Sequence, residues 1–289
     1  MDLLRQSGES LAGRITYVGL GPLDVLELQS LNRDLTPLWV RGGFPDSFLV
    51  ADDRDSLSWR KDFVRSYLER ELPLLGPRIP AETLERLWIM LAHTQGGLLN
   101  ASRLAAALMM VSAQTADRYS DLLADLLLVW RLPPFHSNAG KRLVKSPKIY
   151  VRDSGIVHAL LGIADFNALS GHPVVGLSWE GFVIENLLAA APPLTIASFY
   201  RTSAGAEVDL VLEIPGYGLW AINIKRGLSA RPERGFHNAC LDLRPARNFA
   251  INAGAGRYRI SQDVEAAGLT DIAAELATLS FGQAGVARH

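Results

Sequence analysis

Residues 201–213 read RTSAGAEVDLVLE, and this stretch decides the fold of the segment 179–225 around it. Polar and apolar residues alternate over 207–213, and a period of two is typical of a β-strand with one face toward the core. The alternation predicts two faces, with Glu207, Asp209 and Glu213 on one and Val208, Leu210 and Leu212 on the other. We therefore expect a half-buried strand whose polar face carries acidic side chains.

The next residues predict the second arm of a hairpin. Residues 214–218, IPGYG, are turn formers, and LWAINIK at 219–225 alternates again. The predicted hairpin brings Asp209, Asn223 and Lys225 onto one surface. Upstream, WEGFVIENLLAAA at 179–191 has helical periodicity with Glu180 on its apolar stripe.

An Asp on one strand and an acidic-x-Lys pair on the next, after a helix with a Glu, resembles the PD-(D/E)xK nuclease fold. In that fold carboxylates hold Mg²⁺ against a phosphodiester. The resemblance implies that Glu180 is the helix acid and Asp209 the central metal ligand, and that Lys225 positions or activates the attacking water. Asn223 stands where the pair has its acid, and a neutral amide oxygen does not balance the metal's charge. Loss of cleavage is the expectation, and a solvated polar surface is the plainer alternative.

Composition sets the class of the protein. The chain has 289 residues, 48% of them hydrophobic, which is enough for a sizeable core and favours two domains. Its 29 basic and 30 acidic residues give a net charge of −1, which argues against a general nucleic-acid coat. Cys240 is the single cysteine, so a reduced, cytoplasmic setting is expected. The start MDLLRQSGES has no apolar signal core, and the apolar run 122–130 is too short for a membrane span, so no membrane partner is expected.

Residues 81–125 predict a helix-turn-helix arrangement. ETLERLWIMLAHT forms the first helix, Asn100 can cap ASRLAAAL, and Ser112 can cap the longer helix that follows. The exposed start of that last helix would present three side chains to DNA bases: Gln114, Thr115 and Arg118.

A basic hairpin is predicted behind these helices. RLPPFHSNAGKRLVKSPKIYVR at 131–152 holds six basic residues and no acid, with a turn at 138–140. The cations expected to track phosphates are Lys141, Arg142, Lys145 and Lys148. Helices followed by such a hairpin make a winged helix, which serves either as a double-stranded DNA reader or as a protein-docking module. Both interpretations stay open at this point.

Six motifs carry a wider resemblance: LLRQSGESLAGR, VRGGFP, YLERELPLLG, KRLVKSPKIYVRDSGIVHALLG, WEGFVIENLL and FYRTSAGAEVDLVLE. They resemble bacterial and archaeal ATP-binding proteins in which an AAA-type ATPase module precedes a C-terminal domain of unknown function. That domain combines a winged helix with a PD-(D/E)xK-like fold. The implied parts are an ATPase remnant at 1–30, a helical connector at 31–80, a winged helix at 81–170, the nuclease-like domain at 171–280 and a tail at 281–289.

The fold class expected is therefore mixed α/β. No G-x-x-x-x-G-K-[ST] phosphate loop occurs, because Gly140-Lys141 is the only Gly-Lys pair, so no ATP site is expected in this chain. Two functions compete. One is a truncated, non-enzymatic module that docks on DNA, on another protein or on an AAA-type ATPase homologue. The other is a Mg²⁺-dependent DNA nuclease that uses Glu180, Asp209 and Lys225, with Asn223 as a neutral ligand.

Overall fold

The computed structural model describes residues 20–29, 34–75, 79–109, 111–135, 143–227, 231–254 and 256–279. The fold is mixed α/β, as expected. Most of the expected ATPase remnant and the tail lie outside these ranges. Within the described ranges, none of the helices is long and apolar enough to cross a lipid bilayer.

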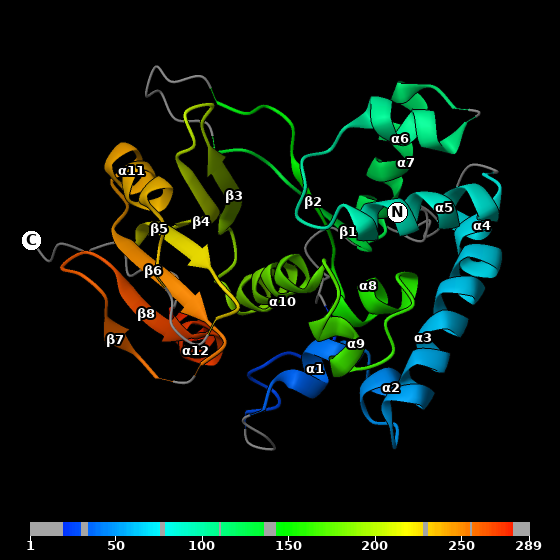
Figure 1. The fold of residues 1–289 in the computed structure, drawn as a ribbon, viewed down its shortest axis with the longest axis horizontal. Coiled ribbons are helices and arrows are strands. Elements are labelled where there is room, and N and C mark those ends of the chain that lie inside the picture. The colour runs from blue at the N-terminus through cyan, green and yellow to red at the C-terminus, as the bar shows by residue number, and fades with distance from the viewer. Residues whose placement is uncertain are drawn as a thin grey trace, which may run out of the picture.

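The N-terminal half is helical, and Figure 1 shows its helices gathered on the right of the molecule. Its first helices are α1 (Thr36–Arg41), α2 (Pro45–Phe48), α3 (Asp53–Ser66) and α4 (Leu72–Leu75), with a π-helical segment (Tyr67–Glu71) joining α3 to α4. Asp52 caps α3, since its carboxylate accepts from the backbone N–H groups of Arg54 and Asp55. Together these segments form one continuous helical stretch over 53–75 within the connector expected at 31–80.

The next three helices and the hairpin follow the predicted order. They are α5 (Ala81–His93), α6 (Ala101–Leu108), α7 (Ala113–Asp125), β1 (Val129–Leu132) and β2 (Lys148–Val151). Asn100 and Ser112 cap α6 and α7 as the sequence predicts. The strands β1 and β2 pair antiparallel, and Leu98 forms a bridge to the other side of Lys148. The order is thus helix, extended segment, two helices and two strands.

The hairpin arms lie against a second sheet. Phe135 N–H donates to Phe199 O at 2.6 Å, Phe199 N–H donates to Pro133 O at 3.0 Å, and Val144 N–H donates to Arg201 O at 3.1 Å. These bonds cover the edge of strand β3 (Ile196–Arg201). Covering an edge strand blocks pairing with another chain. The predicted turn at 138–140 lies outside the described residues.

The second sheet has six strands in the order β3-β4-β5-β6-β8-β7. The remaining elements are α8 (Ser154–Leu160), α9 (Phe166–Ser170), α10 (Val175–Ala190), β4 (Glu207–Ile214), β5 (Gly218–Ile224), α11 (Arg234–Leu243), β6 (Arg247–Asn252), β7 (Tyr258–Arg259), β8 (Glu265–Gly268) and α12 (Leu269–Thr278). Strands β3, β4 and β5 are antiparallel, whereas β5, β6 and β8 run parallel. From α10 onward the order is a helix, three strands, the helix α11, three further strands and the helix α12.

The regular alternation expected for β4, with Val208 and Leu210 on the same face, is wrong. Ser198 pairs with Val211 and Tyr200 with Val208, so two residues of β4 stand opposite Phe199 alone. The alternation therefore breaks in the middle of the strand. Leu210 joins the core that contains α10 and α12, whereas Val208 joins the separate core around α11.

Helix α10 connects the two halves of the molecule, and it lies between the sheet and the helices in Figure 1. Residues 178–184 are all buried, so this helix has no water-facing side over two turns. One continuous core runs from Trp39 and Trp88 in the helical half through α10 to Phe249 in the sheet.

Candidate functional site

The structure brings Glu180, Asp209 and Asn223 together where β4 and β5 separate. Pairing between these strands ends at Leu210 and Ile222. Beyond that point the Asp209 carboxylate, and not the backbone of β4, accepts a hydrogen bond from the backbone of β5. Its Oδ2 accepts from the Asn223 Nδ2 at 2.9 Å and from the backbone N–H of Ile224 at 2.8 Å.

Lys225 lies close to this cluster but turns away from it. Its Nζ donates to Oε1 of Glu233 at 3.0 Å, and the Lys225 side chain is partly exposed while that of Glu233 is largely exposed. The pKa of Lys225 is raised, because the hydrogen bond to Glu233 and the charge of Asp209 outweigh the effect of burial. Lys225 thus acts on Asp209 through its field and not by contact.

Lys148 is the main correction to the sequence analysis. We expected it on an exposed phosphate-reading arm, but its side chain is 4% exposed. Its Nζ lies 3.2 Å from Oε1 of Glu180, 3.2 Å from Oε1 of Glu207 and 3.9 Å from Oδ1 of Asp209. The Phe199 ring face lies 5.5 Å from the same atom. The ammonium is enclosed by acids, so it is not available to DNA phosphates.

Two further polar groups complete the cluster. The Tyr150 hydroxyl donates a short hydrogen bond to Oε1 of Glu180. Burial, and then the charge of Glu180, hold the pKa of Tyr150 well above its ordinary value, so the phenol stays a donor. The Oδ1 of Asn223 is buried and has no hydrogen-bond partner among the described residues.

The electrostatics follow from three acids around one ammonium. Burial, and then the charge of Glu180, raise the pKa of Asp209 to about 7. Burial lowers the pKa of Lys148, but Glu180, Asp209 and Glu207 more than offset this, so that its pKa lies above the ordinary value. Lys148 therefore stays charged, and Asp209 titrates near neutral pH.

This arrangement does not fit the Mg²⁺ that the nuclease resemblance implies. The oxygens that would ligate a metal point at Lys148 Nζ, which already supplies the positive charge. In the part of the chain that the structure describes, no three His, Cys, Asp or Glu side chains are placed to hold a metal ion together.

The residues predicted to contact DNA differ in their exposure to solvent. Gln114, Arg118 and Lys145 are exposed, whereas Thr115 is half-buried and its hydroxyl contacts Ser112 at 2.9 Å. Lys141 and Arg142 lie outside the described residues.

The other cations of the hairpin have internal partners. Arg131 pairs with Asp117 and Asp121 on α7. Arg152 Nη2 lies 2.7 Å from Oε1 of Glu185, and its guanidinium stacks on Trp130 at 4.4 Å. Three of the hairpin's six basic residues, Arg131, Lys148 and Arg152, are thus paired with acids of the protein itself.

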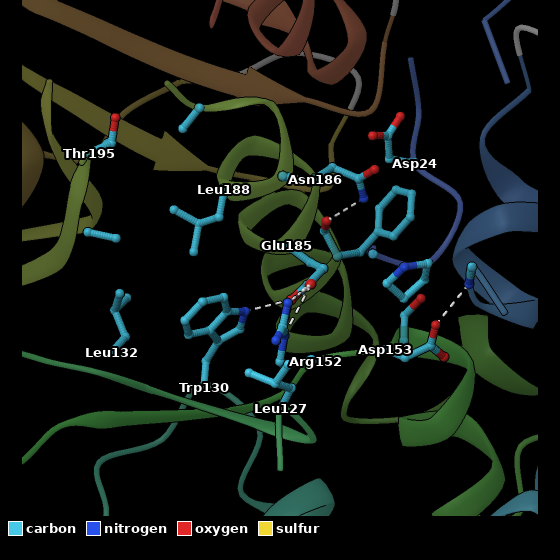
Figure 2. A pocket seen from close by; sticks show the side chains of 18 of the residues that line it. Asp24, Leu127, Trp130, Leu132, Arg152, Asp153, Glu185, Asn186, Leu188 and Thr195 are labelled. Carbon is cyan, nitrogen blue, oxygen red and sulfur yellow. Dashed lines mark hydrogen bonds and ion pairs between the residues drawn. The ribbon is translucent and has the colours of Figure 1, made fainter. Parts of the chain in front are cut away.

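A cleft of about 880 Å³ lies beside the ion pair of Arg152 and Glu185 (Figure 2). Trp130 Nε1 donates to Oε2 of Glu185 at 2.6 Å, so one carboxylate holds both the indole and the guanidinium of Arg152. Asn186 closes another wall, since its Oδ1 accepts from the backbone N–H of Val25 at 2.9 Å. The rim is apolar and exposed, with Leu20 98%, Leu127 68%, Leu194 77% and Ile196 60% accessible.

Sequence reasoning missed Tyr150, the position of Lys148 and the part played by Glu207. A period of two over Lys148-Ile-Tyr150 puts the lysine and the tyrosine on one face of β2. That spacing was a usable signal for Tyr150. No local signal pointed to the acids opposite, because they come from α10 and β4.

Two family models match the chain. Residues 32–167 match "Domain of unknown function (DUF8612)" and residues 175–272 match "Domain of unknown function (DUF4143)". DUF4143 is commonly associated with AAA-type ATPases, which indicates an ATPase-associated module.

The chain is also similar to two mycobacterial proteins. "Uncharacterized protein Mb2031c" of Mycobacterium bovis and "Uncharacterized protein Rv2008c" of Mycobacterium tuberculosis are each 43% identical over 267 residues. The match covers 92% of this chain and 59% of each relative, so the chain spans less than two thirds of their length. No solved structure matches the chain.

Proposed function

We propose that this chain is a non-catalytic docking module of an ATPase-associated protein, and that its partner is a protein. The observation that carries the proposal is that most of the hairpin's described cations form ion pairs with acids of the same chain. Among the described basic residues of 131–152, three are paired with acids and only Lys145 is exposed without such a pair. A hairpin that reads DNA needs free cations for the phosphates, which supply most of the affinity.

The element order supports the two folds in this proposal. Helix, extended segment, two helices and two paired strands is the order of a winged helix, and such units also dock proteins. Helix, three strands, helix and strand supports a PD-(D/E)xK-like scaffold. Lys148 at the centre of the acids and Asn223 at the acidic position both favour a scaffold without cleavage.

The partner that we propose is an AAA-type ATPase homologue, and the cleft of Figure 2 is its docking surface. Its rim exposes four large apolar side chains, and exposed apolar groups that gather in one place mark interaction sites. Leu127 and Leu194 also have positive φ, 60° and 68°, which a β-carbon disfavours. Apolar side chains held exposed in strained backbone suit a contact surface.

A binding measurement with matched variants tests this function. The ligand is a purified full-length AAA-type ATPase homologue, and binding is followed by biolayer interferometry. We expect Leu194→Asp to weaken binding at least about tenfold. Leu241→Asp on α11 is the control, because Leu241 is 76% exposed but does not line the cleft. Equal effects of the two substitutions, or no binding of the homologue, would refute the proposal.

Duplex DNA is the second candidate partner, and the exposed start of α7 favours it. Gln114 and Arg118 lie there, and Lys145 is exposed on the hairpin. Fluorescence anisotropy with a labelled duplex at low salt measures this function directly. DNA docking requires that Arg118→Ala and Lys145→Ala weaken binding and that affinity falls steeply with salt. If the chain binds duplex DNA in this way and ignores the ATPase homologue, DNA is the partner.

A further inference from the structure

The cleft beside the ion pair of Arg152 and Glu185 follows an open edge of strand β1. Residues 130–133 line it one after another. Side chains of a strand alternate between two faces, so consecutive residues border the same cleft where the cleft runs along the edge of the strand. Among the described residues, β1 pairs with β2 on one side only. The other edge of β1 therefore faces the cleft.

The backbone of Arg131 shows that this edge is unpaired. Arg131 stands opposite Ile149 of β2. The Ile149 N–H donates to Gly97 O at 2.9 Å, and the Ile149 carbonyl accepts from the Gly96 N–H at 2.7 Å, so both groups point away from β1. Opposite residues of an antiparallel pair exchange both of their hydrogen bonds or neither. The N–H and C=O of Arg131 therefore point to the cleft side, and neither bonds to a described residue.

Strand β3 presents a second open edge to the cleft, at Ala197. The Phe199 N–H donates to Pro133 O at 3.0 Å, so the backbone groups of Phe199 point away from β4. Backbone direction alternates along a strand, so the N–H and C=O of Ala197 point the same way. Neither of them has a partner among the described residues. The two edges are thus joined at Pro133 and separate before it, and Figure 2 shows Leu132 and Thr195 on different sides of the opening.

We propose that the cleft binds an extended peptide segment of the AAA-type ATPase homologue, and that this segment adds a strand between β1 and β3. The inference rests on the docking function proposed above and specifies the form in which the partner binds. Edge strands expose unpaired N–H and C=O groups, and an extended peptide pairs with them through its own main chain. Arg131 offers such groups on one side of the cleft and Ala197 offers them on the other.

The charges at the cleft specify the composition of the segment. Arg131 and Arg152 line the cleft, and both pair with acids of the same chain. Asp24 and Glu27 line it as well, and among the described residues their carboxylates accept only from backbone N–H groups. Two acids are thus left that no described cation pairs with, and electrostatic complementarity favours a segment with Lys or Arg. Its other side chains should be apolar, since the rim exposes Leu194 and other large apolar residues.

Peptide binding measured by fluorescence anisotropy tests the inference on the whole chain. The probes are short overlapping peptides that together cover the sequence of the ATPase homologue. We expect neighbouring peptides that combine Lys or Arg with alternating apolar residues to bind. The infrared spectrum of such a peptide with isotope-labelled carbonyls should show the band of a β-strand when the peptide is bound to wild type.

Two proline variants locate the paired edges. Proline removes a backbone N–H, and where that N–H points outward from an edge strand the pairing with the inner strand stays intact. Arg131→Pro should weaken peptide binding at least about tenfold more than Arg131→Ala, which loses the same side chain but keeps the N–H. Ala197→Pro should likewise weaken it at least about tenfold more than Ala197→Ser does. If a proline variant does not fold, the infrared spectrum with wild type decides alone.

Three results would overturn the inference. One is a homologue that binds, with Leu194→Asp weakening it, while no peptide binds, because the docking function would then stand without strand addition. Another is a bound peptide with a helical or unordered infrared band, or proline variants that bind as well as their controls. The third is self-association of the chain that Ala197→Pro abolishes, because the cleft would then hold a second copy. Failure of the homologue itself to bind would refute the docking function first and this inference with it.

Discussion

The Nε2 atom of His158 lies 2.7 Å from the Oγ of Ser178, which ties α8 to α10 in the core between the two halves. The other ring nitrogen, Nδ1, faces the carbonyl oxygen of Val40 at 2.9 Å. A carbonyl can only accept, so Nδ1 carries the proton and Nε2 accepts from the serine hydroxyl. Trp39 Nε1 donates to the same Oγ at 3.0 Å. Both nitrogens of the neutral imidazole thus have a hydrogen-bond partner.

This histidine predicts a loss of stability in acid. Burial lowers the pKa of His158 from 6.5 to about 3. The unfolded chain therefore takes up a proton below pH 6.5 that the folded chain refuses, and stability falls as the pH drops toward 3. The slope should reach at most about 1.4 kcal/mol per pH unit. Urea unfolding from about pH 7 to about pH 4 measures it.

The control for this effect is His158→Gln, which has no proton to gain. Asp209 contributes with the opposite sign, since its raised pKa favours the folded state as pH falls through about 7. Asp209 is present in both proteins, so the difference between their pH profiles isolates His158. Identical profiles would show that His158 is not neutral and buried in solution.

A second prediction concerns Arg60, a fully buried side chain in α3. Its Nη1 donates to Gly155 O at 2.7 Å and to Val40 O at 3.2 Å, and its Nε donates to Ser56 O at 3.1 Å. Arg60→Met should lower the free energy of unfolding by about 3 kcal/mol, because three buried carbonyls lose a charged donor. Arg65→Ala on the same helix should change it by less than about 0.5 kcal/mol, since Arg65 is 76% exposed. Similar losses for both would contradict this role.

A third prediction concerns two glycines. At Gly155 an added β-carbon would lie 2.2 Å from the carbonyl oxygen of Arg41, so α8 packs directly on the end of α1. Gly155→Ala should therefore destabilise the protein by roughly 2–3 kcal/mol in thermal unfolding. Gly176→Ala in α10 meets nothing within 4 Å and should be neutral or slightly stabilising. A neutral Gly155→Ala would mean that the two helices are further apart than described.

The fourth prediction is the absence of nuclease activity. Wild type should not cut plasmid or single-stranded DNA in Mg²⁺ or Mn²⁺, because Lys148 holds the acids. Asn223→Glu restores the missing carboxylate but leaves the ammonium in place, so it should also be inert. Metal-dependent cutting by wild type that disappears in Asp209→Ala would make the chain an enzyme and refute the docking function.

Much of the local structure could be predicted from the sequence. The hairpin over 207–225, the caps Asn100 and Ser112, and the pairing of β1 with β2 depend on short-range patterns. Asp209 and Asn223 were placed together for the same reason, since a hairpin register brings them side by side.

The rest depends on contacts between distant residues. A lysine in a basic stretch looks solvent-exposed, and the acids that bury Lys148 stand 32 or more residues further along the chain. The irregular pairing of β4 opposite Phe199 could not be foreseen, because it is set by β3 and not by the alternation within β4. DNA docking, metal dependence and the cytoplasmic setting remain predictions.

Helix α10 has a consequence for how the whole chain unfolds. Residues 178–184 of α10 are all buried. Separating the two halves of the molecule would therefore expose this apolar helix to water. Separate expression of residues 34–170 and 171–279 should therefore yield unfolded or aggregated fragments, although the described residues form two separate sheets. We expect the intact chain to melt in a single cooperative transition, without a separate transition for either half.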